Sequence, residues 1–376
     1  MMYREIQLEN WRNFKRVHAS LTPRVFLVGP NASGKSNFLD VFRFLQEIAK
    51  VGGSFQNAVS SRGGVSKLRS YAARRYPDVS IDVSLETNST VWRYVIAFTQ
   101  DNQSRPVLTR EEVWKGRSLL LKRPDPEDEA DPIRMTATAL EQVNVNKPFR
   151  EVVKFLASAR YLHIVPQLVR DPDRSVGRQA DPYGGDFLEQ LAKTQPRVLS
   201  SRLAKIRDAL KVAVPQLRDL QLKKDEKGTP HLLSLYEHWR PNAGWQNESQ
   251  LSDGTLRLMG LLWALLDDSG PLLLEEPELS LHPEVVRYIP QMISRLVTKK
   301  PRQVLLSTHS PSLLEDDGIG PEEVLLLVPS KEGTEIQLGK DDAQIHALLE
   351  GGATMAEAVL PRTRPSQVQQ LTFFGE

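Results

Sequence analysis

Residues 29–36 read Gly29-Pro30-Asn31-Ala32-Ser33-Gly34-Lys35-Ser36, which is the complete phosphate-binding pattern G-x-x-x-x-G-K-S. A triphosphate carries several negative charges in a small volume, and the glycines of this pattern let backbone N–H groups converge on it. We expect Lys35 to reach the β- and γ-phosphates and the Ser36 hydroxyl to ligate Mg²⁺. The octapeptide therefore predicts a site for ATP with Mg²⁺, and all eight residues are candidate contacts.

The segments on either side of this loop support the same interpretation. Residues 25–28 predict a buried strand, and residues 36–45 predict a helix with apolar side chains at positions 38, 41, 42 and 45. Such a helix directs its N-terminus at the phosphates, and Asn37 in its first turn is a further candidate contact. The alternative is a glycine-rich turn without a ligand, which the strand–loop–helix order disfavours.

The composition is that of an ordinary globular protein. Of 376 residues, 40% are hydrophobic and 26% are charged, and a net charge of +2 says little about nucleic acid. The chain has no cysteine, which excludes disulfides and thiol catalysis and suits a reducing cytosol. Residues 1–9 do not resemble a signal peptide, and apolar stretches such as 261–266 are too short to span a membrane. We therefore expect a cytoplasmic protein without a membrane partner.

Hydrophobic patterns change in style along the chain. The first part alternates, which predicts half-buried antiparallel strands at 3–9, 79–85, 91–98 and 107–121. Residues 123–132 are rich in proline and acid, which predicts an exposed loop. The middle predicts helices at 149–158, 186–193 and 197–213 and a long loop at 170–185. After residue 250 the pattern predicts a parallel α/β sheet, with strands at 271–275, 303–307, 323–328 and 335–338 and helices at 253–266, 283–298, 341–349 and 354–360.

Two adjacent carboxylates, Glu275 and Glu276, stand at the end of the strand predicted at 271–275. A P-loop ATPase needs acids at this carboxyl edge of the sheet, beside the nucleotide. We expect Glu275 to help hold Mg²⁺ and Glu276 to polarise the attacking water as a general base. The first position usually holds Asp, so the longer Glu275 predicts a slightly different metal geometry. A surface acidic turn is the alternative interpretation.

Two further segments are weak signals when each is considered alone. Ser252 is a good N-cap for the helix predicted at 253–266, and Gly254 permits close backbone approach. By itself this is only the start of a helix. His309 follows the buried residues 304–306, and a single histidine at a strand end is more often structural.

The order of these four segments resembles that of ABC-type ATPases of the RecF/SMC/OLD group, particularly compact ATPases of bacteria and their defence systems. The resemblance covers nearly the whole chain and implies an α/β ATPase head: a parallel P-loop sheet, an antiparallel β lobe and a small helical insertion. It also implies that Ser252 and Gly254 belong to a signature loop, which caps the γ-phosphate held by another subunit. His309 then resembles the histidine that senses the γ-phosphate, and residues 277–283 resemble a segment of the dimer interface.

The resemblance extends to the start of the chain. Residues 8–14 read Leu-Glu-Asn-Trp-Arg-Asn-Phe and look like the opening "L-x-N-F-R-x-F" of this group. That turn lies near the nucleotide base in the family, which makes Arg12 and Asn13 candidate contacts. Gln167 is a candidate for the family's glutamine loop, whose position is otherwise not evident.

The departures from the family narrow the expected function. SMC proteins insert long heptad segments before the signature loop, whereas residues 37–251 show no sustained heptad pattern, so bridging of DNA by long arms is not expected. OLD nucleases carry a C-terminal metal-dependent nuclease, whereas the residues after His309 are few and show no Asp-x-Asp on a buried strand. We therefore expect a chain without its own nuclease.

The remaining charged residues give weaker signals. One basic cluster with an aromatic residue consists of Arg62, Lys67, Arg69, Arg74, Arg75 and Tyr71. It predicts either contact with a DNA backbone or a solvated surface. A second cluster consists of Arg170, Arg174 and Arg178. The histidines at 163, 231 and 238 lack metal-ligand company, and we expect His231 and His238 to be ordinary residues.

These observations lead to one expected architecture and function. Residues 1–160 form a lobe with the phosphate loop, and residues 161–376 form a second lobe with a helical insertion at about 186–240. Two ATP molecules are sandwiched in a homodimer or higher even oligomer, which acts as a switch for a separately encoded effector, such as a nuclease, in DNA surveillance or anti-phage defence. The alternative is a DNA-repair ATPase that clamps DNA directly. A transporter ATPase is disfavoured by the RecF-like opening.

Overall fold

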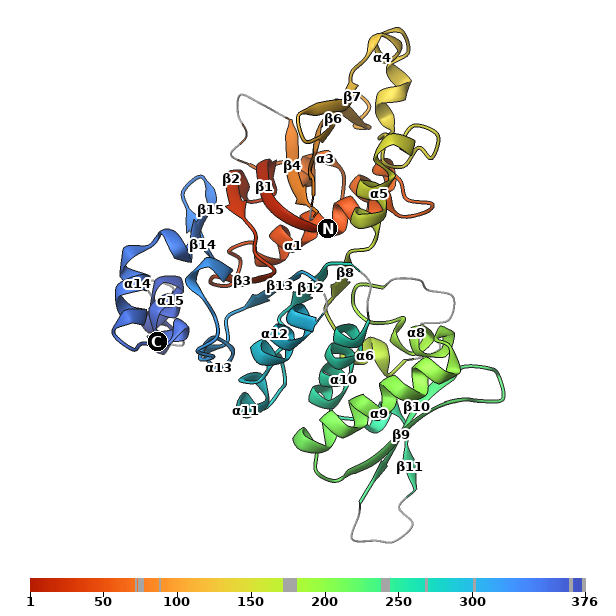
Figure 1. The fold of residues 1–376 in the computed structure, drawn as a ribbon, viewed down its shortest axis with the longest axis vertical. Coiled ribbons are helices and arrows are strands. Elements are labelled where there is room, and N and C mark those ends of the chain that lie inside the picture. Colours follow the sequence, from red (N-terminus) through yellow and green to blue (C-terminus); the bar gives the residue numbers. More distant parts are fainter. Residues whose placement is uncertain are drawn as a thin grey trace. The chain divides into compact units, whose positions relative to one another are not determined.

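The computed structural model describes residues 1–71, 73, 78–87, 89–171, 181–237, 244–267, 270–299, 302–364 and 368–373 (Figure 1). Five residues singled out above lie outside this set: Arg74, Arg75, Arg174, Arg178 and His238.

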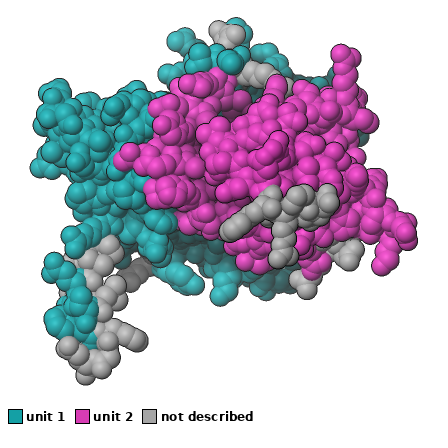
Figure 2. Space-filling view, turned by 90° about the horizontal axis from the view of Figure 1, so that it is seen from below, with its two compact units in different colours: residues 1–160, 269–273, 297–376 teal, residues 161–268, 274–296 magenta. Residues whose placement is uncertain are grey.

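The chain forms two compact units, which Figure 2 shows in different colours. The first contains residues 1–160, 269–273 and 297–376, and the second contains residues 161–268 and 274–296. This division differs from the two lobes expected from sequence, because the C-terminal strands complete the sheet around the strand that precedes the phosphate loop.

An antiparallel sheet of order β2-β1-β4-β5-β6-β7 belongs to the first unit. Its strands are β1 (Met2–Trp11), β2 (Phe14–Ser20), β4 (Val79–Glu86), β5 (Val91–Gln100), β6 (Pro106–Lys115) and β7 (Ser118–Arg123). In β4 buried and half-buried residues alternate along the strand, which is the period of two that the sequence predicts. The alternating segments are therefore strands, as expected.

The second sheet has the order β15-β14-β3-β13-β12-β8. Its strands are β3 (Arg24–Val28), β8 (Arg160–Leu162), β12 (Leu272–Glu275), β13 (Val304–Thr308), β14 (Val324–Ser330) and β15 (Gly333–Leu338). Strand β3 is parallel to both β13 and β14, and Val28 pairs with Thr308 and with Leu326. The carboxyl ends of these strands thus share one edge of the sheet, which confirms the predicted parallel α/β arrangement.

Helices of the first unit pack around these two sheets (Figure 1). They are α1 (Lys35–Ala49), α2 (Phe55–Ser60), α3 (Val65–Leu68), α4 (Pro126–Ala130), α5 (Arg150–Ala157), α13 (Pro311–Leu314), α14 (Ala343–Glu350) and α15 (Met355–Thr363). Helix α1 buries a row of aromatic and aliphatic side chains and contacts α5. Phe42 packs edge-on against Tyr3 of β1, which joins the helix after the phosphate loop to the antiparallel sheet.

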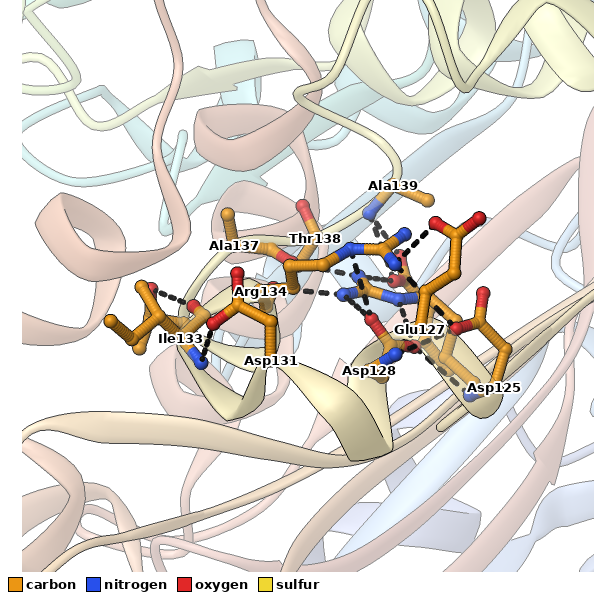
Figure 3. A network of polar contacts seen from close by, with 12 residues as sticks. Asp125, Glu127, Asp128, Asp131, Ile133, Arg134, Ala137, Thr138 and Ala139 are labelled. Carbon is orange, nitrogen blue, oxygen red and sulfur yellow. Dashed lines mark hydrogen bonds and ion pairs between the residues drawn. The ribbon is translucent and has the colours of Figure 1, made fainter.

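Residues 123–132 are mostly exposed, as the sequence predicts, but they contain helix α4 and two buried charged residues. Arg123 and Asp128 are buried, and α4 begins with a capping box at Asp125. The Arg123 guanidinium donates to both Asp128 carboxylate oxygens at 3.0 and 2.9 Å and to Glu111 at 3.1 Å. It also donates to the carbonyls of Arg134 and Ala137, each at 2.8 Å. Figure 3 shows Asp125, Asp128 and Arg134 of this network of polar contacts. Internal pairing therefore buries two charged residues of a segment that is otherwise largely exposed.

The second unit holds helices around a small sheet of order β11-β10-β9. Its strands are β9 (Leu217–Lys224), β10 (Pro230–Tyr236) and β11 (Trp245–Gln246), and its helices are α6 (Pro166–Val169), α8 (Phe187–Lys193), α9 (Pro196–Ala213), α10 (Asp253–Leu266), α11 (Pro283–Val286) and α12 (Ile289–Lys299), whose last turn enters the first unit. The insertion at 186–240 is therefore helical only in its first half. The single helix expected at 283–298 is instead two helices, separated at residues 287–288. Pro290 has no N–H group to continue the hydrogen bonds of α11, and it lies in the first turn of α12, where proline is tolerated.

No helix among the described residues is both long and apolar enough to cross a membrane.

Candidate nucleotide-binding site

The phosphate loop lies between the end of β3 and the start of α1, as the sequence predicts. Ala32 and Gly34 have left-handed backbone conformations, with φ of 63° and 97°. A Cβ atom added to Gly29 would lie 2.5 Å from the Ser33 hydroxyl and 2.8 Å from the Leu327 carbonyl of β14. Position 29 therefore accommodates only glycine, because the loop passes so close to β14 there. Ala32 is exposed at the tip of the loop.

The polar side chains of the loop fit a phosphate group. Lys35 is buried, and its ammonium donates to the carbonyls of Gly29 at 2.9 Å and Pro30 at 3.2 Å. The Ser33 hydroxyl is buried without a hydrogen-bond partner among the described residues. An unsatisfied buried hydroxyl costs free energy, so a group that accepts its hydrogen bond would remove this cost. Ser36 is exposed in the first turn of α1.

Asn13 holds the phosphate loop in place through side-chain hydrogen bonds. Its amide nitrogen donates to the Ser33 carbonyl at 2.9 Å and to the Thr334 hydroxyl of β15 at 2.7 Å, and its oxygen accepts from Asn37 at 2.7 Å. A Cβ atom on Gly34 would lie only 2.1 Å from the same amide. Asn13 therefore joins the loop, α1 and β15, and its contact with a nucleotide base stays a prediction.

Arg12 points instead at a charged cluster on α1. Its guanidinium donates to Asp40 at 3.0 Å, and Arg62 pairs with the same carboxylate at 2.8 Å and with Glu47. Burial alone would raise the pKa of Asp40, but the hydrogen bond and charge of Arg62 outweigh it, and with the charges of Arg12 and Arg43 they lower the pKa below its usual value. The Arg12 Nε atom is buried without a hydrogen-bond partner in the described part of the chain.

His309 stands at the same edge of the sheet as the loop. It is exposed between β13 and α13, one residue after Thr308, which pairs with Val28 at the start of the loop. The next residue, Ser310, caps α13. The first unit by itself thus brings the phosphate loop and His309 to neighbouring strand ends.

The signature segment belongs to the second unit. Ser252 caps α10 by accepting from the Thr255 N–H group at 3.2 Å. A Cβ atom on Gly254 would lie 2.5 Å from the Ser280 carbonyl, so the start of α10 packs directly on the segment that follows the paired acids. Arg170 donates to the Leu251 carbonyl at 2.6 Å, which fixes the residue before the cap.

Arg170 also makes an ion pair with Asp253 in the first turn of α10, at 2.5 Å. On the same helix, burial lowers the pKa of Arg257, and the charges of Asp253 and Glu276 act in the opposite direction. One ion pair and the nearby charge of Arg257 therefore surround the start of α10 within the second unit.

Glu275 ends β12, Glu276 follows it directly, and both acids are half-buried. The Tyr161 hydroxyl donates to the Glu275 carboxylate, and Nδ1 of His163 lies 3.3 Å from the Glu275 carbonyl. Glu276 is a non-glycine residue in the left-handed region, with φ of 43°, a conformation that costs about 1–3 kcal/mol and often marks functional sites.

The structure also gives residues that the sequence did not single out. Tyr161 and Asp40 belong to no motif that the sequence reveals, and only their contacts with Glu275 and Arg12 single them out. Thr334, which contacts Asn13, lies in a strand far along the chain. Gln167, the candidate for the glutamine loop, is exposed in α6, and its role stays a prediction.

Comparison with protein families gives one match. A family model described as "AAA domain, putative AbiEii toxin, Type IV TA system" matches residues 24–315, which is more than half of the chain. No curated protein matches the chain in sequence.

Comparison with solved structures gives matches to SMC heads. One is the SMC head bound to the C-winged helix domain of ScpA, with 11% identity, a TM-score of 0.52, and coverage of 90% of this chain and 98% of that chain. Another is the SMC head domain with an extended coiled coil bound to the C-terminal domain of ScpA, from Pyrococcus furiosus, with 11% identity, a TM-score of 0.52, and coverage of 93% and 99%. At this identity the likeness concerns the fold.

Proposed function

Because this chain belongs to the AAA-domain family whose model it matches, and because it has the fold of an SMC-like, ABC-type P-loop ATPase, we propose that it acts as an ATP-driven switch. ATP joins two heads into a dimer, or a higher even oligomer, and hydrolysis releases them. The switch gates a separately encoded effector, such as a nuclease, in DNA surveillance or anti-phage defence.

The observation that carries ATP binding is the construction of residues 29–36. The loop combines a glycine cradle, a buried Ser33 hydroxyl without a partner and a lysine ammonium held at the loop carbonyls. Lys35 can exchange its two carbonyl acceptors for phosphate oxygens, which form stronger, charge-assisted hydrogen bonds. Mg²⁺, held by Ser36 and Glu275, would neutralise charge on the β- and γ-phosphates.

Hydrolysis in this proposal depends on Glu276 and His309. Glu276 accepts a proton from the attacking water, and its left-handed backbone is a strained conformation of the kind that often marks functional sites. His309 contacts the γ-phosphate from the end of β13, beside the loop. Ser252 and Gly254 act on the nucleotide of the partner head, with backbone N–H groups at the start of α10.

The effector part of the proposal is supported by the family and by the fold. The family description refers to a toxin of a toxin–antitoxin system, and the similar SMC heads are seen with a domain of another protein bound to them. A head that binds a partner protein is therefore compatible with this fold.

The alternative, a DNA-repair ATPase that clamps DNA directly, has less support. It relies on the basic cluster at 62–75. The Arg62 side chain is only 4% exposed and is paired with Asp40 and Glu47, so it is not available to DNA. Lys67 is exposed, Arg69 is half-buried in a bridge to Trp11, and Arg74 and Arg75 lie outside the described residues.

The test is the solution mass of the wild-type protein and of Glu276→Gln, each with and without Mg-ATP. The substitution removes the proposed base and keeps ATP bound, so the variant should shift to a stable dimer only when ATP is present. Lys35→Ala is the control and should keep one mass in both conditions. A Glu276→Gln mass that never depends on ATP would contradict the switch.

The trapped dimer then serves as bait for partners. The effector proposal expects a protein to co-purify with Glu276→Gln in ATP and not with Lys35→Ala. Recovery of DNA without any protein partner would favour the DNA-clamping alternative.

A further inference from the structure

We infer that Tyr161 and His163 position the two paired acids, with Tyr161 orienting the Glu275 carboxylate for Mg²⁺ and His163 fixing the peptide that carries Glu276. The inference rests on the proposed function, because it assigns these residues to the ATP-hydrolysing site. It also explains how a glutamate can stand where this type of ATPase usually has an aspartate.

The tyrosine contact is made between neighbouring strands of one sheet. Tyr161 lies in β8, Glu275 ends β12, and these strands are adjacent in the sheet order. The phenol hydroxyl donates to the Glu275 carboxylate across 114 residues of sequence. Glutamate has one more rotatable bond than aspartate, so a metal ligand at this position loses more side-chain entropy when it is ordered. A hydrogen bond that fixes the carboxylate before the ion arrives removes part of this cost.

The histidine contact acts on the backbone between the acids. Nδ1 of His163 lies 3.3 Å from the Glu275 carbonyl, so with a proton on Nδ1 the ring donates to the peptide that joins Glu275 to Glu276. Glu276 has a φ of 43°, which persists only where surrounding contacts hold it. His163 supplies such a contact at the adjoining carbonyl.

The orientation of His163 is in turn set by the segment at 182–183. The backbone N–H group of His163 donates to the Pro182 carbonyl at 3.0 Å, which fixes the main chain at this position. The Tyr183 ring packs edge-on against the imidazole, with ring centroids 6.1 Å apart. Two residues of the segment 161–163 thus hold the paired acids: Tyr161 contacts the Glu275 carboxylate, and His163 contacts the peptide group that precedes Glu276. All of these contacts lie within the second unit.

The first experiment measures how much Mg²⁺ is needed for ATP binding in the absence of turnover. In the Glu276→Gln background, binding of a fluorescent ATP analogue is titrated with Mg²⁺. Tyr161→Phe keeps the ring and removes one hydroxyl. Loss of a hydrogen bond to a ligating carboxylate typically weakens metal affinity about 10–100-fold, so the Mg²⁺ concentration at half-saturation should rise by this factor. Analogue binding in EDTA should stay unchanged, which a general loss of structure would not allow.

The matched control is Tyr288→Phe, which removes a tyrosine hydroxyl from an exposed position of the same unit and should leave the Mg²⁺ titration unchanged. Glu275→Asp tests the same bond from its other end, since a side chain shorter by one methylene draws the carboxylate back from the phenol. It should also raise the Mg²⁺ requirement, and the double variant with Tyr161→Phe should be no worse than either single one. Additive effects would overturn the inference.

The histidine is tested by its effect on turnover. His163→Ala with Glu276 intact should lower kcat by at least tenfold and leave the Mg²⁺ half-saturation unchanged, because it disturbs only the second acid. An equal change in both quantities would overturn its assignment. If Glu276→Gln itself does not bind the analogue with Mg²⁺, the proposed function fails; if it binds and Tyr161→Phe titrates like it, only this inference fails.

Discussion

Gly34 and Gly52 both adopt left-handed backbone conformations, yet the space around them differs. Gly34, in the phosphate loop, has a φ of 97°, and a Cβ atom there would lie 2.1 Å from the Asn13 amide. Gly52, just after α1, has a φ of 71°, and a Cβ atom there meets nothing within 4 Å. A comparison of the two glycines therefore distinguishes the effect of backbone strain, which both share, from the steric clash with Asn13, which occurs only at Gly34.

Alanine substitutions at these two glycines should therefore differ in their effect on ATP. Gly34→Ala should lower the free energy of unfolding by about 1–3 kcal/mol through strain and also weaken ATP binding at least tenfold, because Asn13 must leave its bonds to the loop. Gly52→Ala should show the strain alone. Urea unfolding and equilibrium ATP binding measure the two effects, and equal ATP affinities would contradict the supporting role of Asn13.

Asp40 makes stability depend on pH. Its pKa is lowered in the folded state by Arg62, Arg12 and Arg43, so it contributes stability above its unfolded pKa of about 3.9 and loses that contribution as pH falls through the lower folded value. Asp40→Asn should therefore be less stable than the wild type at pH 7, and the difference should shrink below about pH 4. Urea unfolding at a series of pH values measures this. A difference that stays constant down to pH 2 would exclude the ionised Asp40 as its cause.

At the scale of elements, the segment from β7 to α4 is held by one buried guanidinium. Arg123 donates to Glu111 and Asp128, and Ala139 donates its N–H group to Glu111 at 2.9 Å. Burial raises the pKa of Glu111, while the Ala139 N–H group, Arg123 and Tyr94 act in the opposite direction. The short helix α4 thus depends on an ion-pair network for its position and does not depend on a large apolar face.

Removal of Arg123 should be costly because both acids remain buried. Arg123→Met should lower the free energy of unfolding by about 3–5 kcal/mol, the usual effect of leaving a buried charge without its partner. Arg105→Met is the control, since Arg105 pairs with Asp101 on the surface and is 60% exposed, and such pairs contribute about 1 kcal/mol or less. Urea unfolding compares the two variants, and equal losses would contradict the buried role.

At the scale of the whole molecule, the chain passes repeatedly between its two units. It crosses within β8 and β12 as well as near residues 268 and 296, so neither unit is a continuous segment of sequence. The strand before the phosphate loop finds its parallel partners, β13 and β14, in residues that come almost 300 positions later. The residues that we propose for ATP hydrolysis consequently belong to different units, with the phosphate loop and His309 in one and Ser252 and the paired acids in the other.

The sequence alone determined the features that depend on neighbouring residues. The phosphate loop, the alternating strands, the helix after Ser252 and the strand before Glu275 follow from local spacing and from hydrophobic periods, and they lie where the sequence predicts. The order of these motifs sufficed to indicate an SMC-like ATPase fold, which the comparisons support.

Only the tertiary structure decided which distant side chains meet. The bond from Tyr161 to Glu275 spans 114 residues, and the bond from Asn13 to Thr334 spans 321. Arg123 reads as part of an exposed acidic loop until Glu111 on β6 and Asp128 on α4 enclose it. Local patterns report what each residue prefers, whereas these contacts depend on the order of strands in the sheets, and no spacing along the chain specifies that order.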